Sequence, residues 1–491
     1  MKLIRLTVLS LLMLSGTCLA TPIYHPPGPN LIYGAISNNQ SIMSEVTNPA
    51  AGASALLEEK SRYRFGILSS IGFGYEFGDV NNLYDEIDRT ITTLSETQSL
   101  DMQAIVDAQA IDPGLFATDT AYRDQKVSAV ANAAANEINT NVVNPLNYLQ
   151  QLVDKEGYFK GFASGHVPLM PFVISHRGLG GSFTLDANVA VAGFLDFLGD
   201  DIPQFTEADI YTSIEQTLQQ TVSGGGGANL LYDVLASDST LLVKGAYISE
   251  VSLGYSWITM NHALGNLFTG VRAKYYQAKL TQYAQRLSDL SSTQNSEDIY
   301  NDQKDADYQQ SAALGLDAGV LWVADNYRAG ATIDNINKPS FKYPTLALTD
   351  SLGSMNYDTT GSVYNSLRKG STYEMKPQLR LEGGLFTRNT NWVVGGSLDV
   401  NAVEDPFAQE FQWATVSAAY AASKFYIPGV RLGYRTNLAG SKQSYAGIGL
   451  TWLTINFDIA YGLDEIKYMD NGKQKKAPRS ALFNIGWAMT F

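Results

Sequence analysis

The chain has 491 residues, of which only 17% are charged, below the roughly 25% usual for soluble globular proteins. Acidic residues outnumber basic ones, 48 against 34, which gives a net charge of −14. Nucleic acid and anionic membrane surfaces both require a basic face, so this balance argues against either as a partner.

The first twenty residues have the three parts of a secretory signal. A basic start and an apolar stretch, residues 6–14, precede a small residue, Ala20, at the expected cleavage point. The apolar stretch is too short to span a bilayer. Cys18, the only cysteine, lies within this segment, and the residues before it do not match a lipidation signal. We therefore expect a mature chain without disulfides, thiolate catalysis or cysteine metal sites.

After residue 20 the sequence has no run of 18 apolar residues, so it predicts no transmembrane helix. A secreted chain without such a helix can still cross a membrane as a closed β-barrel. Residues 21–60 are first Pro-rich, then polar, and end in a short helical stretch, ASALLEEK. This segment is too long for a simple tail, and the lumen of a barrel would accommodate it.

Residues 62–77, RYRFGILSSIGFGYEF, alternate between large apolar side chains and small or polar ones. This period of two predicts a strand, and its length suits a tilted membrane strand that continues beyond the bilayer. The same alternation recurs in residues 373–387, where polar groups occupy one face in succession. Such a face fits water or a polar lumen better than an apolar core.

Fourteen segments of this kind can be identified, an even number, as in closed bacterial barrels. Two boundaries are weakly marked: the break at 452/453 has no turn residue, and Pro377 would remove a ladder donor from its strand. The predicted strands are 63–77, 168–177, 181–196, 243–258, 267–282, 312–323, 327–336, 373–387, 391–402, 410–421, 428–437, 444–452, 453–463 and 480–491.

The connections between these segments alternate between long and short, less sharply after residue 402. Outer-membrane barrels place long loops outside and short turns in the periplasm, whereas a soluble sandwich has no reason to sort its loops. Within the long connections, residues 79–160 and 203–222 have helical apolar spacing. The pattern therefore predicts an all-β transmembrane barrel of about fourteen strands with a mostly helical extracellular insertion.

Several stretches resemble a known family. YGAISNNQSIMSEVTNPAAGA resembles the Asn-Pro-Ala stretch of FadL-type outer-membrane proteins, here Asn48, Pro49 and Ala50. RFGILSSIGFGYEFGDVNNLYDEID, GAYISEVSLGYSW, NYRAGATIDNINKPSF and VRLGYRTNLAGSKQSYAGIGL resemble the conjugal-transfer TraF-like barrel proteins. An unrelated thioredoxin-like protein shares the TraF name, but this chain has no Cys-x-x-Cys motif.

The resemblance implies an outer-membrane barrel of a Gram-negative bacterium, organised as a signal peptide (1–20), a lumenal plug (21–60) and a barrel (61–491) with an insertion at 79–160. The chain's end also resembles the signal read by the barrel-insertion machinery, which is an expected partner together with outer-membrane lipid. The signal residues are Phe483, Ile485, Trp487, Met489 and Phe491.

Enzyme chemistry has little support in the sequence. The four histidines, His25, His166, His176 and His262, lack metal-site spacing, and we expect no metal, cofactor or catalytic residue. The acidic run at 302–307 lacks the Gly and Glu of an EF-hand, and SGGGGAN lacks the context of a phosphate loop.

The polar strand faces are the better candidates for function, as groups that line the lumen. They are Arg64, Glu76, Lys244, Glu250, Arg272, Lys274, Asp317, Glu374, Lys376, Arg380, Glu382, Arg431 and Arg435.

Two functions remain open at this point. One is a plugged channel for a small hydrophobic molecule, with an apolar pocket between residues 21–60 and the barrel wall. The other is a surface or assembly component of a conjugation system that contacts its partners through the extracellular loops.

Overall fold

The computed structural model describes residues 29–490 except for a set of gaps. The gaps are 39–40, 60–61, 79–101, 146, 149, 152–156, 177–179, 201, 223–237, 287–307, 347, 349–356, 370, 388, 390, 422–425 and 471–472. The expected signal peptide, His25, the acidic run at 302–307, SGGGGAN and Phe491 lie outside the described residues.

A single antiparallel sheet of 15 strands closes on itself, because β1 pairs with β21 as well as with β2 and β3. The strands β2 and β3 lie end to end between β1 and β4, so the barrel has fourteen strand positions. The strands are β1 (Tyr63–Phe77), β2 (Phe159–His166), β3 (Phe172–His176), β4 (Gly181–Leu198), β5 (Thr240–His262), β6 (Gly265–Arg286), β7 (Tyr308–Val323), β8 (Tyr327–Asp334), β11 (Gln378–Phe386), β12 (Trp392–Asp399), β15 (Trp413–Tyr420), β16 (Gly429–Asn437), β17 (Ser444–Trp452), β18 (Ile455–Gly462) and β21 (Ser480–Thr490).

The predicted fold class is confirmed, and each of the fourteen predicted segments contains a barrel strand. The weakly marked break at 452/453 is a turn, in which Leu453 adopts a φ of 56°. Two predicted boundaries are wrong. Residues 159–166, assigned to the long connection after the first strand, form β2. Residues 373–376 leave the wall, so Pro377 precedes β11 and removes no ladder hydrogen bond.

Outward-facing side chains on the barrel are mostly large and apolar. Leu253, Leu314, Val416 and Leu432 are each more than half exposed, and similar residues continue around the wall. Aromatic pairs mark the end with short turns, such as Trp392 beside Tyr420, with ring centroids 4.9 Å apart. A continuous apolar exterior with aromatic residues at its rim is the surface of a lipid-facing barrel.

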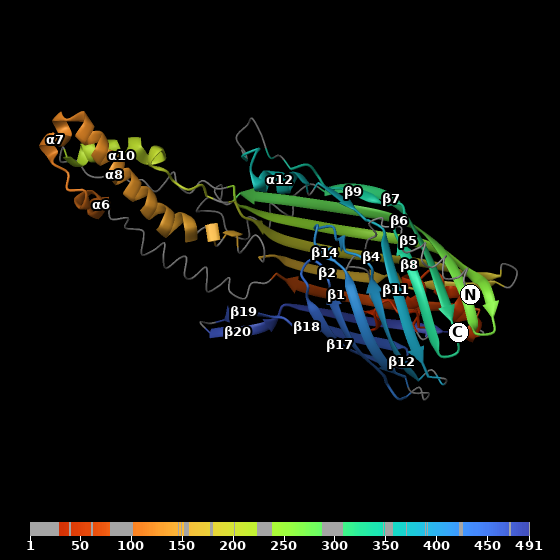
Figure 1. Cartoon of the computed structure of the whole chain (residues 1–491). Coiled ribbons are helices and arrows are strands. Elements are labelled where there is room, and N and C mark those ends of the chain that lie inside the picture. The colour runs from red at the N-terminus through yellow and green to blue at the C-terminus, as the bar shows by residue number, and fades with distance from the viewer. Residues whose placement is uncertain are drawn as a thin grey trace, which may run out of the picture.

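The helices in the connections between strands gather at one end of the barrel (Figure 1). This end receives the connections after β1, β4, β6, β8, β12, β16 and β18, whereas β1 begins and β21 ends at the other. Sorting by length weakens late in the chain, where residues 421–428 at the short-turn end outnumber 438–443 at the helical end.

Two insertions distant in sequence share one helical core. The first carries α6 (Met102–Ala108), α7 (Pro113–Thr118), α8 (Thr120–Ile138) and the π-helix η1 (Asn139–Val143); the second carries α10 (Glu207–Val222). Buried Val130 and Ala134 of α8 pack in one cluster with Ile214 and Leu218 of α10. Among the described residues, no helix is both long and apolar enough to cross a membrane.

The remaining elements after β1 are short and lie in the long connections. They are α12 (Ser362–Lys369) and three two-stranded sheets: β9 (Ser340–Lys342) with β10 (Thr372–Glu374), β13 (Val403–Glu404) with β14 (Glu410–Phe411), and β19 (Glu465–Asp470) with β20 (Lys473–Pro478).

Candidate functional site: the filled barrel lumen

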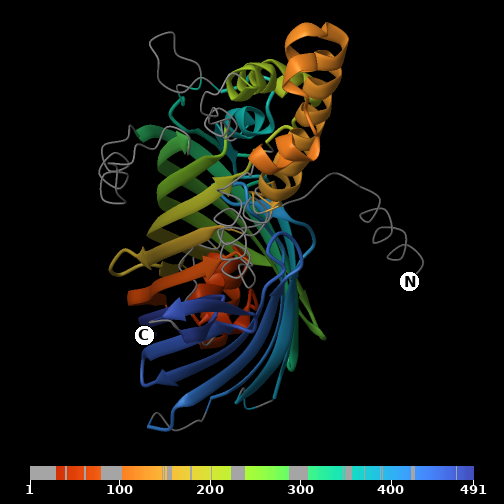
Figure 2. The same ribbon diagram turned by 90° about the vertical axis from the view of Figure 1, so that its left-hand side faces the viewer.

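The N-terminal segment, which we call the plug (residues 29–59), lies inside the barrel (Figure 2). It consists of α2 (Asn30–Tyr33), α3 (Met43–Thr47) and α4 (Ala51–Glu59). Helix α2 contacts strands β15 to β18, and α4 contacts β3 to β6. The plug therefore contacts opposite parts of the barrel wall from within.

One wall carboxylate binds two separate turns of the plug. Glu382 of β11 accepts hydrogen bonds from the backbone amide and the hydroxyl of Ser37, the latter at 2.9 Å. Its Oε1 also accepts from Nδ2 of Asn48 at 2.7 Å. Hydrogen bonds to a charged acceptor are stronger than neutral ones, so this residue is a principal anchor of the plug.

The predicted motif residues Asn48, Pro49 and Ala50 form the turn between α3 and α4 and are buried. The Asn48 Oδ1 accepts the Ala50 amide at 2.9 Å, while its Nδ2 reaches Glu382 and, at 3.2 Å, the carbonyl of Val320. The side chain thus fixes the turn that leads into helix α4 and ties this turn to the wall.

The wall is made of glycine where this turn approaches it. A Cβ added at Gly270 would lie only 2.2 Å from the Pro49 carbonyl oxygen, and one added at Gly319 would collide with the Asn48 side chain. On the other side of the barrel, Gly433 faces Ile32 of α2 in the same way. Backbone-to-backbone approach of this kind requires residues without a side chain.

Ion pairs add further links between plug and wall. Arg64 of β1 donates to Glu45 of α3 at 2.8 Å, and both side chains are almost fully buried. Arg272 of β6 donates to the carbonyl of Val46 and also pairs with Asp317 of β7. A buried charge needs such partners, because an isolated one would lose its hydration without compensation.

The charged network continues along the inner wall. Lys274 pairs with Asp317 at 2.8 Å, Arg380 with Asp399 at 3.1 Å, and Asp334 lies 3.3 Å from Arg272 and 3.6 Å from Arg380. Opposite charges on neighbouring strands therefore neutralise one another in the part of the lumen that the plug contacts.

The β13–β14 hairpin (residues 403–411) crosses the opening of the barrel at its helical end, which we call the outer mouth. It arises between β12 and β15, yet its tip contacts β2 and β4, which lie about half the circumference away in the strand order. Asp405 accepts from Lys160 of β2 at 3.0 Å, and Phe407 stacks on Phe194 of β4, with ring centroids 5.1 Å apart and planes 7° apart.

A second loop supports the hairpin. Tyr343, just after β9, donates its hydroxyl to the Pro406 carbonyl at 2.7 Å. The ammonium of Lys244 lies 4.9 Å from the centre of the Tyr343 ring. Burial, followed by the charge of Asp405, raises the pKa of the Tyr343 hydroxyl, which therefore remains a neutral hydrogen-bond donor.

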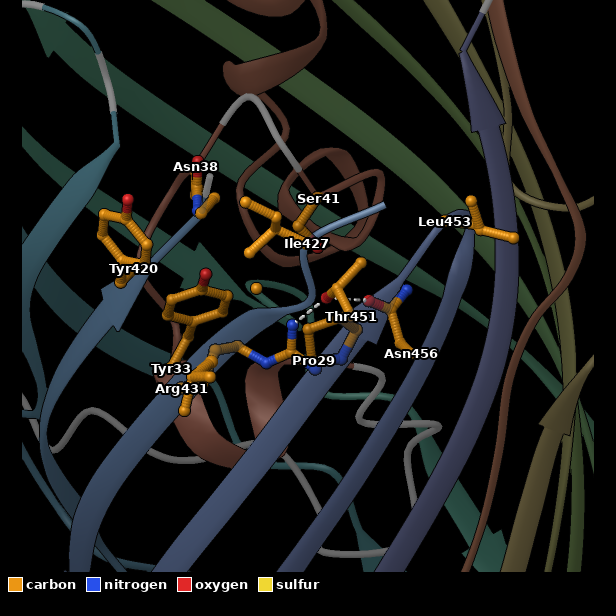
Figure 3. Close-up of a pocket in the computed structure, with 13 residues that line it drawn as sticks. Pro29, Tyr33, Asn38, Ser41, Tyr420, Ile427, Arg431, Thr451, Leu453 and Asn456 are labelled. Atoms are coloured by element: carbon orange, nitrogen blue, oxygen red, sulfur yellow. Dashed lines mark hydrogen bonds between the residues drawn. The ribbon is translucent and has the colours of Figure 1, made fainter. Parts of the chain in front are cut away.

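A cavity of about 270 Å³ lies between plug and wall (Figure 3). Tyr33, Asn38 and Ser41 line it from the plug side, and Arg431 and Tyr420 from the wall. The expectation of an apolar pocket is therefore only partly met, because polar groups share the lining with Pro29, Ile427, Val430 and Leu453.

Arg431 is held firmly at the edge of this cavity. It donates to Asp458 at 2.7 Å and to the Thr451 hydroxyl, and its guanidinium lies 5.6 Å from the Tyr33 ring centre. With its charge paired, Arg431 contributes a planar surface to the cavity.

The other residues predicted from sequence lie in several places. Glu76 accepts from the Tyr158 hydroxyl at 2.6 Å and is buried, as is Glu250. The guanidinium of Arg435 lies 3.8 Å from the ring centre of Trp413. Glu374 is exposed in β10, outside the barrel wall, and Lys376 pairs with Glu404 at 2.9 Å.

The closing strand pairs with β1 and β18, and its Ile485 and Trp487 side chains are exposed on the outer surface. Phe483 packs against Phe73, with ring centroids 4.8 Å apart. Met489 belongs to β21, and its backbone pairs with Phe65. These positions fit both a lipid-facing strand and an insertion signal.

No metal centre is present in the part of the chain that the structure describes: no three His, Cys, Asp or Glu side chains are grouped to hold an ion. His166 is buried with Nε2 3.4 Å from Asp186, and His262 is exposed at the end of β5. His176 belongs to β3.

Sequence reasoning missed several carboxylates that complete these networks. Asp334, Asp399 and Asp458 lie on strands at inward-facing positions, so the alternation that identified Arg272 and Arg431 could have identified them too. Glu45 and Asp405 lie outside the wall strands, and strand alternation carries no signal for them.

Comparison with known proteins gives a family. A model described as "F plasmid transfer operon, TraF, protein" matches residues 45–399, more than half of the chain. No curated protein sequence matches significantly.

Among solved structures, a deletion mutant of the TodX monoaromatic hydrocarbon channel has 10% sequence identity and a TM-score of 0.39, covering 92% of this chain and 95% of that one. A Pseudomonas aeruginosa FadL homologue has 10% identity and a TM-score of 0.33, covering 97% and 100%. These values are low, and the fold is established by the strand pairing itself.

A closed barrel with an apolar exterior places the protein in the outer membrane of a Gram-negative bacterium. With the family model matched over residues 45–399, the chain belongs to the family of the F plasmid transfer operon TraF protein.

Proposed function

We propose that this protein is a plugged channel that passes a small hydrophobic molecule across the outer membrane when the plug moves. The observation that carries this proposal is the way the plug is held. Its contacts with the wall at Glu382, Arg64 and Arg272 are discrete polar contacts, and the wall facing its central turn is glycine.

A plug held in this way can leave its seat without dismantling the barrel. The barrel ladder is complete without it, since β1 closes on β21 through backbone hydrogen bonds. The cavity beside Tyr33 supports the same idea, because its volume of about 270 Å³ suits a small molecule at the plug–wall boundary.

The test is uptake of an apolar dye, N-phenyl-1-naphthylamine, by intact cells that lack or produce the protein. We expect cells that produce the protein to take up more dye than cells that lack it. Deletion of residues 45–52, which removes most of α3 and the Asn48 turn, should change the dye uptake at least threefold. Equal uptake by cells with the full-length and the deleted protein would argue against a plugged channel. A heat-shift in gel mobility verifies that each variant forms a barrel.

A second candidate function rests on the helical unit. The two insertions bury a common core, Val127, Val130 and Ala134 against Ile210 and Ile214, and project from the barrel end that carries the long loops (Figure 1). A folded unit of this kind can serve as a docking element for another protein of a conjugation system. Replacing residues 102–145 with a short linker should then abolish plasmid transfer while leaving barrel insertion and dye uptake unchanged.

A further inference from the structure

A closed aromatic cluster lies beneath the β13–β14 hairpin at the outer mouth. The barrel wall contributes Phe194, Ile248 and Tyr276, and the loops contribute Phe407 and Tyr343. Every one of these side chains is buried, although two of the five come from loops. The cluster is distinct from the cavity beside Tyr33, with which it shares no residue.

Phe407 belongs to this cluster but not to the barrel wall. Its ring stacks almost parallel on Phe194, the geometry with which a flat aromatic molecule would bind the same ring. It is carried by the tip of a hairpin, where the next residue, Ala408, is exposed.

The hairpin tip is held together by its own hydrogen bonds. The Asp405 carboxylate accepts the amides of Phe407 and Gln409 at 2.9 and 3.0 Å, so these contacts stay within the hairpin. Among the described residues, Lys160 pairs with Asp405 and Tyr343 donates to the Pro406 carbonyl. These two contacts tie the tip to the rest of the barrel, together with the attraction between Lys244 and Asp405. Both contacts are made by a side chain or a carbonyl of the tip, and neither continues the backbone ladder of the barrel.

We propose that this cluster is a binding site for a planar, uncharged aromatic ligand, and that Phe407 occupies the site until the ligand's ring replaces it. The assignment rests on the proposed channel function, for which it supplies the outer binding step and the ligand class. A ring-for-ring exchange on Phe194 preserves the stacking and the buried apolar area, so binding must offset the polar contacts of the tip and the freedom that the ligand loses on binding.

The charges near the cluster favour an uncharged ligand. Lys160 is paired with Asp405, and the Lys244 ammonium lies over the ring of Tyr343. A cationic ligand would meet these two ammonium groups, and a charged group of either sign would exchange its hydration for apolar and aromatic side chains such as Phe194 and Ile248. A neutral ring meets neither penalty.

The test is calorimetric titration of indole into the detergent-solubilised full-length protein, with the heat of detergent micelles alone subtracted. Removing the internal competitor should tighten binding, so Phe407→Ala should lower the Kd at least tenfold relative to the unmodified protein. Phe411→Ala is the matched control. It removes an equally buried ring from the same hairpin, but Phe411 packs with Val403 and Trp413 outside the aromatic cluster.

A second substitution tests the stacking partner. Adding Phe194→Ala to Phe407→Ala should cancel the gain. Equal Kd values for the unmodified protein and Phe407→Ala, or the same gain from Phe411→Ala, would overturn the assignment. Phe407→Leu, which keeps apolar bulk but no flat ring, should give a smaller gain, and it provides the test if the alanine variant fails the gel-mobility check for a folded barrel.

Indole binding and dye uptake separate this site from the channel itself. Indole binding that depends on Phe407, without dye uptake that depends on the plug, would support the aromatic site and contradict the channel function. Dye uptake that depends on the plug, without indole binding that depends on Phe407, would support the channel function and contradict the site.

Discussion

Replacing Glu382 with alanine should release the plug. The change removes the acceptor for Ser37 and Asn48, which belong to separate turns of the plug. A hydrogen bond to a charged group contributes roughly 1.5–3 kcal/mol, so loss of the links to both turns costs about 3–6 kcal/mol. Because 1.4 kcal/mol is a factor of ten, the ratio of released to seated plug should rise by about 10² to 10⁴.

The assay is single-channel recording in planar bilayers, in which released plugs appear as an increased open probability. Glu374→Ala is the control, since it removes the same charge from an exposed position in β10, outside the wall. Glu382→Gln keeps an acceptor oxygen, so its open probability should lie between those of Glu382→Ala and Glu374→Ala. An open probability for Glu382→Ala equal to that of Glu374→Ala would refute the idea that this carboxylate anchors the plug.

Three other perturbations have defined outcomes. Gly270→Val should raise the open probability, because its side chain would clash with the Pro49 carbonyl. Gly193→Val should not raise it, because a Cβ there meets nothing within 4 Å. Asp405→Asn leaves the buried Lys160 ammonium without its carboxylate and should lower the free energy of unfolding by about 3–5 kcal/mol, measured by denaturant titration; the exposed pair of Lys476 and Glu465 provides a control, and Glu465→Gln should change little. Ile214→Asp places a charge in the core shared by α8 and α10, so far-ultraviolet circular dichroism should show lost helix while heat-shifted gel mobility still reports a closed barrel.

The barrel was predictable because the membrane constrains every strand in the same way. Each segment must be apolar outside and small or polar inside, and this period of two is visible in single stretches such as residues 62–77. The strand β2 was missed because Phe159–His166 is short and follows a helical segment directly. Residues 373–376 were assigned to the wall because they continue the alternation, although there it reflects burial against the loops at the outer mouth.

The lumen was less predictable, because its contacts join residues that no local pattern relates. Alternation indicated that Glu382 faces inward, but its partners Ser37 and Asn48 lie more than 300 residues away in the sequence. Phe407 is a similar case. Its sequence neighbourhood, VEDPFAQE, is that of a polar turn, and its burial follows from the hairpin's reach across the barrel.

The glycine seat under the plug has a consequence for the width of any opening. If the wall carried larger side chains here, they would change rotamer when the plug left and would narrow the opening. Gly270, Gly319 and Gly433 have no side chain, so the opening would keep the width of the plug backbone that had filled it. For the same reason, the plug could return to its place without any wall side chain having to change rotamer.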